Sequence, residues 1–223
     1  MKHTILLKSY LGFSVVYLLI ILLGREDLAW FMKPFLIPFL LQAVYFCGNF
    51  PSKKFLLGAL LFSWVGDILL MFADKGELYF ILGLVAFLIS HLVYIILFSK
   101  QTRITMYHNK AIFWVGTTAI IIYLIALYSL LLPSLGDLQI HVLAYAIVLS
   151  TMLLFAFKGY FKWHKPASIY ILCGAIVFVS SDSILALNKF YEPIKYSSFL
   201  IMATYIAAQY LIVSGILKMN KKN

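Results

Sequence analysis

Charged residues are scarce in this sequence: they make up 12% of its 223 residues, and only eight of them are Asp or Glu. A soluble domain carries about 25% charged residues, because its surface has to face water. The chain is instead 64% hydrophobic. This composition excludes an ordinary soluble enzyme, and it excludes a disordered chain, which requires low hydrophobicity. The sequence therefore indicates a protein whose solvent is lipid.

Cysteine is rare, and several common catalytic motifs are missing. Cys47 and Cys173 lie in apolar segments without a CxxC motif, so a disulfide scaffold is excluded and both are interpreted as packing residues. The chain also has no HExxH, no GxSxG and no glycine loop of the kind that binds phosphate. These absences leave no motif for a zinc protease, a serine hydrolase or a nucleotide-binding enzyme.

Long apolar runs fill most of the chain, and each is close to the roughly 20 residues that a helix needs to cross a bilayer. They lie at 4–23, 33–50, 54–73, 78–99, 111–132, 138–157, 167–187 and 195–217. The connecting segments are short, so we expect residues 1–223 to form a single integral membrane domain. The predicted fold class is all-α, a polytopic membrane bundle of eight transmembrane helices.

The net charge of +10 follows the membrane topology. With a cytoplasmic N-terminus, 13 of the 18 Lys and Arg residues fall on the inner side, and six of the eight acidic residues fall on the outer side. The positive-inside rule therefore predicts that both termini are cytoplasmic, in a cell membrane if the source is bacterial. Because the basic residues stand between apolar runs and not along one polar face, we expect membrane lipid and no nucleic acid as the partner.

Two acidic residues remain inside the apolar runs, Asp67 in the third and Asp182 in the seventh. A charged residue at the centre of a membrane helix costs about 2.5–3.5 kcal/mol on insertion scales, so such residues are typical of functional sites. The contexts Gly66-Asp67 and Ser181-Asp182 lie four spans apart in parallel helices, which suggests a parallel four-plus-four repeat. By the helical rise, both carboxyl groups lie roughly 20–25 Å above the inner boundary.

Two carboxyl groups at one depth can supply an acid and a base together, because they do not both ionise readily in a medium of low dielectric constant. The alternative is that each forms hydrogen bonds between helices and serves only to hold the bundle together.

Further polar side chains fall on shared helix faces in the same region. His91 and Tyr94 are three residues apart in the fourth span, and Tyr205 and Gln209 are four residues apart in the eighth. The expected depth of His91 and Gln209 is greater than that of the two aspartates, so we interpret them as lining the floor of a cavity. His91 is interpreted equally well as a buried histidine without a catalytic role.

Two other features are expected at the outer interface. His141 and Tyr145 form another pair four residues apart, which we interpret as interfacial. Lys33, directly before Pro34 at the expected outer start of the second span, either extends to an anionic headgroup or is an ordinary interface lysine.

A metal site is not expected. Of the five histidines, only His91 and His141 lie within spans, and their expected depths differ. A catalytic zinc ion usually has three protein ligands. We therefore predict no metal and no cofactor.

Several short motifs follow one another along the chain in a fixed order. They are Lys33-Pro34, Gly66-Asp67 with Leu69-Leu70, Gly83-Leu84 with Phe87, His91 and Tyr94, Ser181-Asp182 with Leu185-Ala186, and Tyr205 with Ala208-Gln209. In these residues the sequence resembles the YhhN family, whose characterised members are lysoplasmalogenases. The resemblance implies an integral membrane hydrolase that cleaves the vinyl ether bond of lysoplasmalogens and releases a fatty aldehyde and a glycerophospho-alcohol.

The resemblance places Asp67 and Asp182 in the family's aspartate motifs and implies a lysophospholipid substrate. Our hypothesis is that one of them is the acid and the other the base, with Lys33 on the phosphate and with His91, Tyr94, Tyr205 and Gln209 lining the cavity. The alternative functions are a proton-coupled transporter or a lipid-binding membrane protein that uses the same two aspartates, and, third, a structural role. The sequence predicts no particular oligomeric state.

Overall fold

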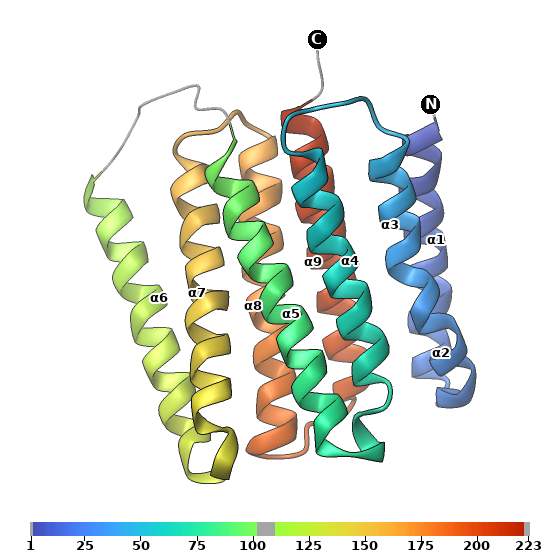
Figure 1. The fold of residues 1–223 in the computed structure, drawn as a ribbon, viewed down its shortest axis with the longest axis vertical. Coiled ribbons are helices and arrows are strands. Elements are labelled where there is room, and N and C mark those ends of the chain that lie inside the picture. The colour runs from blue at the N-terminus through green and yellow to red at the C-terminus, as the bar shows by residue number, and fades with distance from the viewer. Residues whose placement is uncertain (1, 102–109, 221–223) are drawn as a thin grey trace. The chain divides into compact units, whose positions relative to one another are not determined.

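The computed structural model describes residues 2–101 and 110–220, and all regular secondary structure in these ranges is helical (Figure 1). The chain divides into two compact units, Met1–Lys100 and Gln101–Met219. The division falls between the fourth and fifth predicted spans, so that each unit contains four long helical segments.

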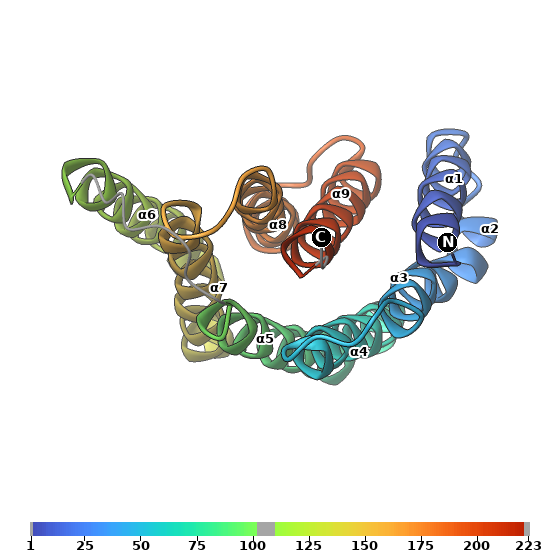
Figure 2. The same cartoon turned by 90° about the horizontal axis from the view of Figure 1, so that it is seen from above.

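The first unit is a row of helices that are neighbours in chain order. Its elements are α1 (Lys2–Leu22), α2 (Glu26–Met32), η1 (Lys33–Phe35), α3 (Leu36–Tyr45), α4 (Lys53–Leu70), η2 (Ala73–Lys75) and α5 (Glu77–Ser99). Seen from above, α1, α3, α4 and α5 follow one another, and α2 lies beside α1 (Figure 2). The most extensive packing in this unit joins α4 and α5.

Glycine lets α4 and α5 approach closely. A Cβ atom at Gly66 would lie 2.6 Å from Cδ2 of Phe87, and one at Gly83 would lie 2.7 Å from Cδ2 of Leu70. Neither position has room for a larger residue, as is common where membrane helices pack through small side chains. This contact fixes the helix that carries Asp67 against the helix that carries His91.

The second unit repeats this order of neighbours with four continuous long helices. Its elements are α6 (Lys110–Leu131), η3 (Leu132–Ser134), η4 (Gly136–Leu138), α7 (Gln139–Tyr160), α8 (Ala167–Phe190) and α9 (Ser197–Met219). The closest pair is again formed by the third and fourth segments, α8 and α9. A Cβ at Gly174 would lie 2.9 Å from the backbone nitrogen of Ile212, and one at Gly215 would lie 3.0 Å from the carbonyl oxygen of Ala167.

The prediction of an all-helical membrane chain is confirmed. Seven segments of the described chain are long and apolar enough to cross a membrane: Lys2–Leu22, Glu26–Tyr45, Glu77–Ser99, Lys110–Ser134, Gly136–Tyr160, Ala167–Phe190 and Ser197–Met219. Helix α4 is not among these seven, because three of its 18 residues are charged, namely Lys53, Lys54 and Asp67.

The predicted start of the second span at residue 33 is wrong. The helical segment begins at Glu26 and runs through η1 to Tyr45. Glu26 and Asp27 stand in its first turn, where acidic side chains favour a helix N-terminus. Pro34 begins a new helical turn at a position where its missing N–H costs little, so the helix continues past it. Lys33 therefore lies within the segment and not at its outer end.

Candidate functional site

The first unit buries the carboxyl group of Asp67 on α4, where the residue is 4% exposed. The preceding residue, Gly66, packs against the ring of Phe87 on α5. The close approach of the two helices at this point removes Asp67 from the lipid-facing surface of α4. A buried carboxyl group needs polar or charged neighbours, and the first unit supplies them from two other segments, η1 and α1.

Lys33 is one of these neighbours. The indole Nε1 of Trp64 donates a hydrogen bond to the carbonyl oxygen of Pro34 at 2.7 Å, which ties η1 to α4. Trp64 precedes Asp67 by three residues and therefore lies on the same side of α4. Lys33 is half-buried in this region and interacts electrostatically with Asp67. The structure thus brings together two of the residues that the sequence analysis selected.

Two tyrosines of α1 are also close to Asp67. Tyr10 is fully buried and Tyr17 is 3% exposed, and both interact electrostatically with the Asp67 carboxyl group. The first span therefore contributes phenol groups to the surroundings of this carboxyl. The sequence analysis did not select them, although both stand on one face of the helix at a spacing of seven residues.

His91 and Tyr94 are both fully buried on α5. Ser90, next to His91, donates a hydrogen bond to the carbonyl oxygen of Ala59 at 2.8 Å, and its hydroxyl lies 2.8 Å from that of Ser63. Ser63 stands one helical turn before Asp67, so His91 lies about 6 Å along the bundle from the level of the carboxyl group. This places His91 beside the Asp67 region but at another depth.

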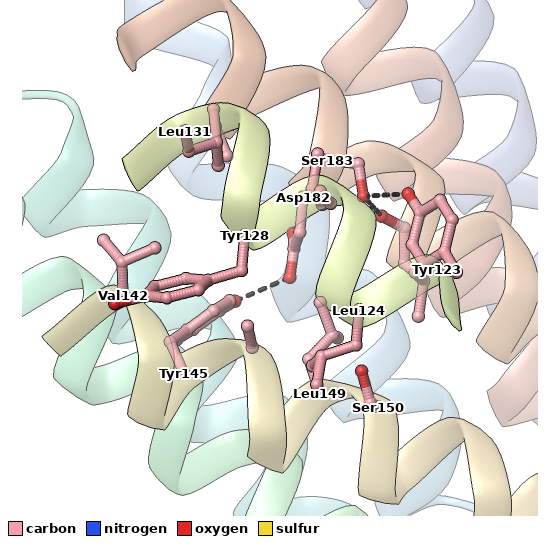
Figure 3. A pocket seen from close by; sticks show the side chains of 14 residues that line it. Tyr123, Leu124, Tyr128, Leu131, Val142, Tyr145, Leu149, Ser150, Asp182 and Ser183 are labelled. Carbon is pink, nitrogen blue, oxygen red and sulfur yellow. Dashed lines mark hydrogen bonds between the residues drawn. The ribbon is translucent and has the colours of Figure 1, made fainter. Parts of the chain in front are cut away.

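The second unit holds Asp182 on α8, where the residue is half-buried. The hydroxyl of Tyr145 on α7 donates a hydrogen bond to Asp182 Oδ2 at 2.6 Å (Figure 3). The hydroxyl of Tyr123 on α6 donates to Ser183 Oγ at 2.6 Å, and Ser183 in turn donates to the carbonyl oxygen of Val179 at 2.6 Å. Three helices of this unit therefore meet at the carboxyl group.

A small pocket opens at this point, with a cavity volume of about 50 Å³, which is space for a few water molecules. Most of the side chains around it are apolar, and Asp182 carries the only formal charge among the 14 lining residues (Figure 3). The lining residues are Tyr123, Leu124, Leu127, Tyr128, Leu131, Val142, Tyr145, Ala146, Leu149, Ser150, Val179, Asp182, Ser183 and Ala186. Such a site can present one carboxyl group to an apolar molecule.

Tyr205 and Gln209 are buried on α9 of the same unit. Gln209 Nε2 donates a hydrogen bond to the Tyr205 hydroxyl at 3.4 Å, and the Tyr205 ring meets the ring of Phe178 edge-on, with 5.7 Å between the ring centres. The structure thus joins the predicted pair Tyr205 and Gln209.

Tyr145 is another residue that the sequence analysis missed. It was interpreted as interfacial, but its hydroxyl bonds the carboxyl group. A signal was available: Tyr145 lies six residues after the start of α7 and Asp182 eight residues before the end of α8. Because the two helices are antiparallel neighbours, these counts place both side chains at one depth. His141 is exposed, as expected for an interfacial residue.

Within residues 2–101 and 110–220, no three His, Cys, Asp or Glu side chains gather closely enough to hold a metal ion. The donors around both carboxyl groups are hydroxyl and amine groups, which suit hydrogen bonding and proton transfer.

The sequence model of the YhhN family matches residues 28–216 of the chain. The chain belongs to the YhhN family. All seven of the predicted site residues, and Tyr145, lie within the range that matches the YhhN model, whereas Tyr10 and Tyr17 lie before it.

Several relatives in this comparison are named lysoplasmalogenase. The chain is 34% identical to the human protein named lysoplasmalogenase TMEM86A over 175 residues, which cover 73% of the chain and 65% of that protein. It is 31% identical to human lysoplasmalogenase TMEM86B over 202 residues, covering 87% of the chain and 79% of the relative. A lysoplasmalogenase of Mycobacterium tuberculosis is 29% identical over 169 residues, covering 74% of the chain and 60% of the relative.

The chain thus spans less than two thirds of the length of TMEM86A and of the mycobacterial protein. No solved structure matches it.

Proposed function

We propose that this chain is a lysoplasmalogenase-like hydrolase, which cleaves the vinyl ether bond of lysoplasmalogens to a fatty aldehyde and a glycerophospho-alcohol. The observation that carries the proposal is the presence of one carboxyl group among the packed helices of each unit, Asp67 on α4 and Asp182 on α8, in a chain whose YhhN relatives are named lysoplasmalogenases. The substrate is a lysophospholipid that reaches the protein from the membrane.

The residues suit the chemistry of this bond. A carboxylic acid transfers its proton to the vinyl carbon that is not bonded to the ether oxygen, and the electron pair of the double bond forms the new C–H bond, which leaves an oxocarbenium ion. Water adds to the cationic carbon and gives its proton to a carboxylate. The hemiacetal that results breaks its C–O bond, the leaving oxygen takes up one proton, and the hydroxyl proton is released as the aldehyde forms.

One acid and one base are therefore needed, and each unit contributes one carboxyl group. In this scheme Asp67 and Asp182 divide the two roles. Lys33, which interacts with Asp67, is the cation that holds the phosphate of the headgroup. The buried side chains His91, Tyr94, Tyr205 and Gln209 line the substrate cavity.

The membrane arrangement consists of eight spans in one integral membrane domain, residues 1–223, with both termini cytoplasmic. Helix α4, the third long helical segment in chain order, is the span that is added to the seven given above. Its 18 residues have a length of about 27 Å, which is close to the thickness of the hydrocarbon core. The charge of Lys53 is placed at the end of this span, where its ammonium group donates hydrogen bonds to the carbonyl oxygens of Tyr45 and Cys47 at 2.9 and 2.8 Å.

The two units are an internal four-plus-four repeat, and the contacts between helices support this. In the first unit, a Cβ at Gly83 on α5 would lie 3.5 Å from the carbonyl oxygen of Gly66 on α4. In the second, Ser181 on α8 donates a hydrogen bond to the carbonyl oxygen of Ile201 on α9 at 3.0 Å. Gly66 and Ser181 each directly precede the aspartate of their unit, so the two helix pairs meet at matching positions.

The same register pairs the other polar residues. On α5, Phe87 and His91 stand four and eight residues after Gly83. On α9, Tyr205 and Gln209 stand four and eight residues after Ile201. A sequence comparison of the two halves alone does not reveal this correspondence, because Gly83 follows Gly66 by 17 positions whereas Ile201 follows Ser181 by 20. The match of aromatic with aromatic and of polar with polar supports a common origin of the two units.

The second segment of each unit supplies a partner for the carboxyl group of that unit. Lys33, in the second helical segment of the first unit, interacts with Asp67, and Tyr145, in the second segment of the other unit, bonds Asp182. The two units therefore have the same arrangement of segments around the aspartate, but its partner is a lysine in the first unit and a tyrosine in the second. A cation suits the phosphate end of a lysolipid, and a phenol with an apolar pocket suits the ether end.

A repeated unit with an intramembrane carboxyl group is also typical of transporters. A proton-coupled transporter or a lipid-binding membrane protein is therefore the second candidate. The two differ in the product, since a carrier moves its substrate unchanged, whereas the hydrolase releases an aldehyde.

The test is aldehyde release by the purified protein in detergent from a lysoplasmalogen, with a saturated ether lysophospholipid as the substrate control. Asp67→Asn and Asp182→Asn are expected to lose turnover while keeping the thermal unfolding profile of the wild type. Asp74→Asn and Asp137→Asn are matched controls, because both aspartates are exposed in the short 3-10 turns of the two units. Aldehyde release that persists in both buried variants would contradict the scheme, and no release by folded wild type would favour transport.

A further inference from the structure

We infer that Tyr145 is the positioning residue of Asp182: its hydroxyl occupies Oδ2 and thereby leaves proton transfer to Oδ1. This inference rests on the proposed hydrolase function of the same site. Tyr145 does not itself exchange a proton with the substrate and acts only through the carboxyl group.

The first support is the hydrogen bond itself. At 2.6 Å, the distance between the Tyr145 hydroxyl and Asp182 Oδ2 is in the short range that is typical of a hydroxyl donating to a carboxyl oxygen. Both residues line the same pocket and their side chains point toward each other (Figure 3). They come from adjacent antiparallel helices, so the bond is held by the packing of α7 on α8.

The second support is the effect of a fixed hydrogen bond on the orientation of a carboxyl group. The terminal torsion of Asp is broad, so a carboxyl group without a fixed partner samples many orientations. Proton transfer requires the carboxyl group, as acid or as base, to be aligned with the reacting atom, and a small misplacement lowers the rate strongly. A phenol has a single O–H donor, and here Oδ2 accepts it, which fixes the plane of the carboxyl group.

The third support is a neighbouring tyrosine whose hydroxyl forms a hydrogen bond of the same length to a different acceptor. Tyr123 donates to Ser183 at 2.6 Å, one residue along α8 from Asp182. The pocket thus contains two phenols with hydrogen bonds of equal length, of which only the Tyr145 hydroxyl bonds the carboxyl group. A variant at each position separates the loss of a hydroxyl in the pocket from the loss of the bond to Asp182.

The kinetic test uses Tyr145→Phe, which removes one oxygen atom and keeps the ring. We expect kcat to fall by about 10- to 100-fold with KM within about threefold of the wild type, because alignment and not binding is lost. In the Asp182→Asn background, Tyr145→Phe is expected to cause no further loss. Tyr160→Phe, at the far end of α7, is the control and should retain wild-type kinetics. Equal loss from Tyr145→Phe in both backgrounds, or a change in KM alone, would overturn the inference.

A second measurement does not depend on turnover. The carboxyl C=O band that disappears from the infrared spectrum in Asp182→Asn is expected to shift in Tyr145→Phe and to keep its position in Tyr123→Phe. An unshifted band in folded Tyr145→Phe would overturn the inference even if aldehyde is released. A shifted band in Tyr145→Phe, together with no aldehyde release by the wild type, would retain the hydrogen bond between Tyr145 and Asp182. It would reject the proposed hydrolase function and, with it, the positioning role in catalysis.

Discussion

Trp64 donates a hydrogen bond from its indole nitrogen to the carbonyl oxygen of Pro34 at 2.7 Å, across 30 residues of sequence. Through this bond the helix that carries Asp67 holds the turn that carries Lys33. The bond is partly buried, and its acceptor is the carbonyl oxygen whose usual helical partner would be the N–H of residue 38, which is Pro38 and has no N–H. A carbonyl oxygen that a proline leaves without its usual helical partner is thereby satisfied by a side chain of the next helix.

Trp64→Phe is expected to loosen this junction. The change removes the hydrogen bond and keeps most of the aromatic surface, so we expect a loss of about 1–3 kcal/mol in the free energy of unfolding. The KM for a lysoplasmalogen should rise, because Lys33 is no longer held beside α4. Thermal unfolding and steady-state kinetics measure both effects, and Trp114→Phe, at an exposed position on α6, is the matched control. Unchanged stability and KM would show that the bond does not hold the turn.

Lys33→Met tests the cation directly. If Lys33 holds the phosphate of the headgroup, the variant should raise KM by about tenfold or more with a smaller change in kcat, because uniform binding energy is lost. Lys33→Arg should retain part of the binding, since it keeps the charge but changes its geometry. The control is Lys75→Met, at an exposed lysine of η2 in the same unit. A fall in kcat at constant KM would instead assign Lys33 to the chemistry of Asp67.

Gly66→Ala tests the contact that buries Asp67. The added methyl group would lie 2.6 Å from Cδ2 of Phe87, so the two helices would have to separate. Overpacking of this kind costs about 1–3 kcal/mol. Gly12→Ala on α1 is the matched control, because no heavy atom lies within 4 Å of its added Cβ, and we expect its stability to be unchanged or to rise by up to about 1 kcal/mol. Equal melting temperatures for the two variants would show that α5 yields at this position.

The helices were predictable from the sequence because lipid allows few alternatives. A run of about 20 apolar residues has to satisfy its backbone within itself, so the positions of most helices followed from composition alone. The second segment was the exception. Pro34 was interpreted as the start of a span, whereas the acidic pair Glu26 and Asp27 begins the helix and the proline lies inside it. The acidic pair is the start signal that the prediction of this span did not use.

The site was predictable only in part, for a related reason. An aspartate in an apolar run is conspicuous, so Asp67 and Asp182 could be found without a structure. Counting residues along the spans places Tyr145 at the depth of Asp182, but its contact with the carboxyl group also depends on which helix lies beside α7. The same holds for Tyr10 and Tyr17, whose relation to Asp67 depends on the packing of α1 in the first unit.

The proposal that α4 crosses the membrane can be tested by labelling cysteines at its two ends. Asn49 and Asp74 are exposed on either side of α4, before its start and after its end. With Cys47 and Cys173 replaced by serine, Asn49→Cys should react with a membrane-impermeant maleimide only in inverted vesicles, and Asp74→Cys only in right-side-out vesicles. We expect α4 to cross because two of its three charged residues lie at its first turn. Lys53 donates to carbonyl oxygens there, and Lys54 can extend to the interface. Asp67 is then the only charge of α4 that has to be buried. Labelling of both cysteines from the same side would contradict a crossing. Labelling of Asn49→Cys only in right-side-out vesicles and of Asp74→Cys only in inverted vesicles would retain the crossing and invert the topology.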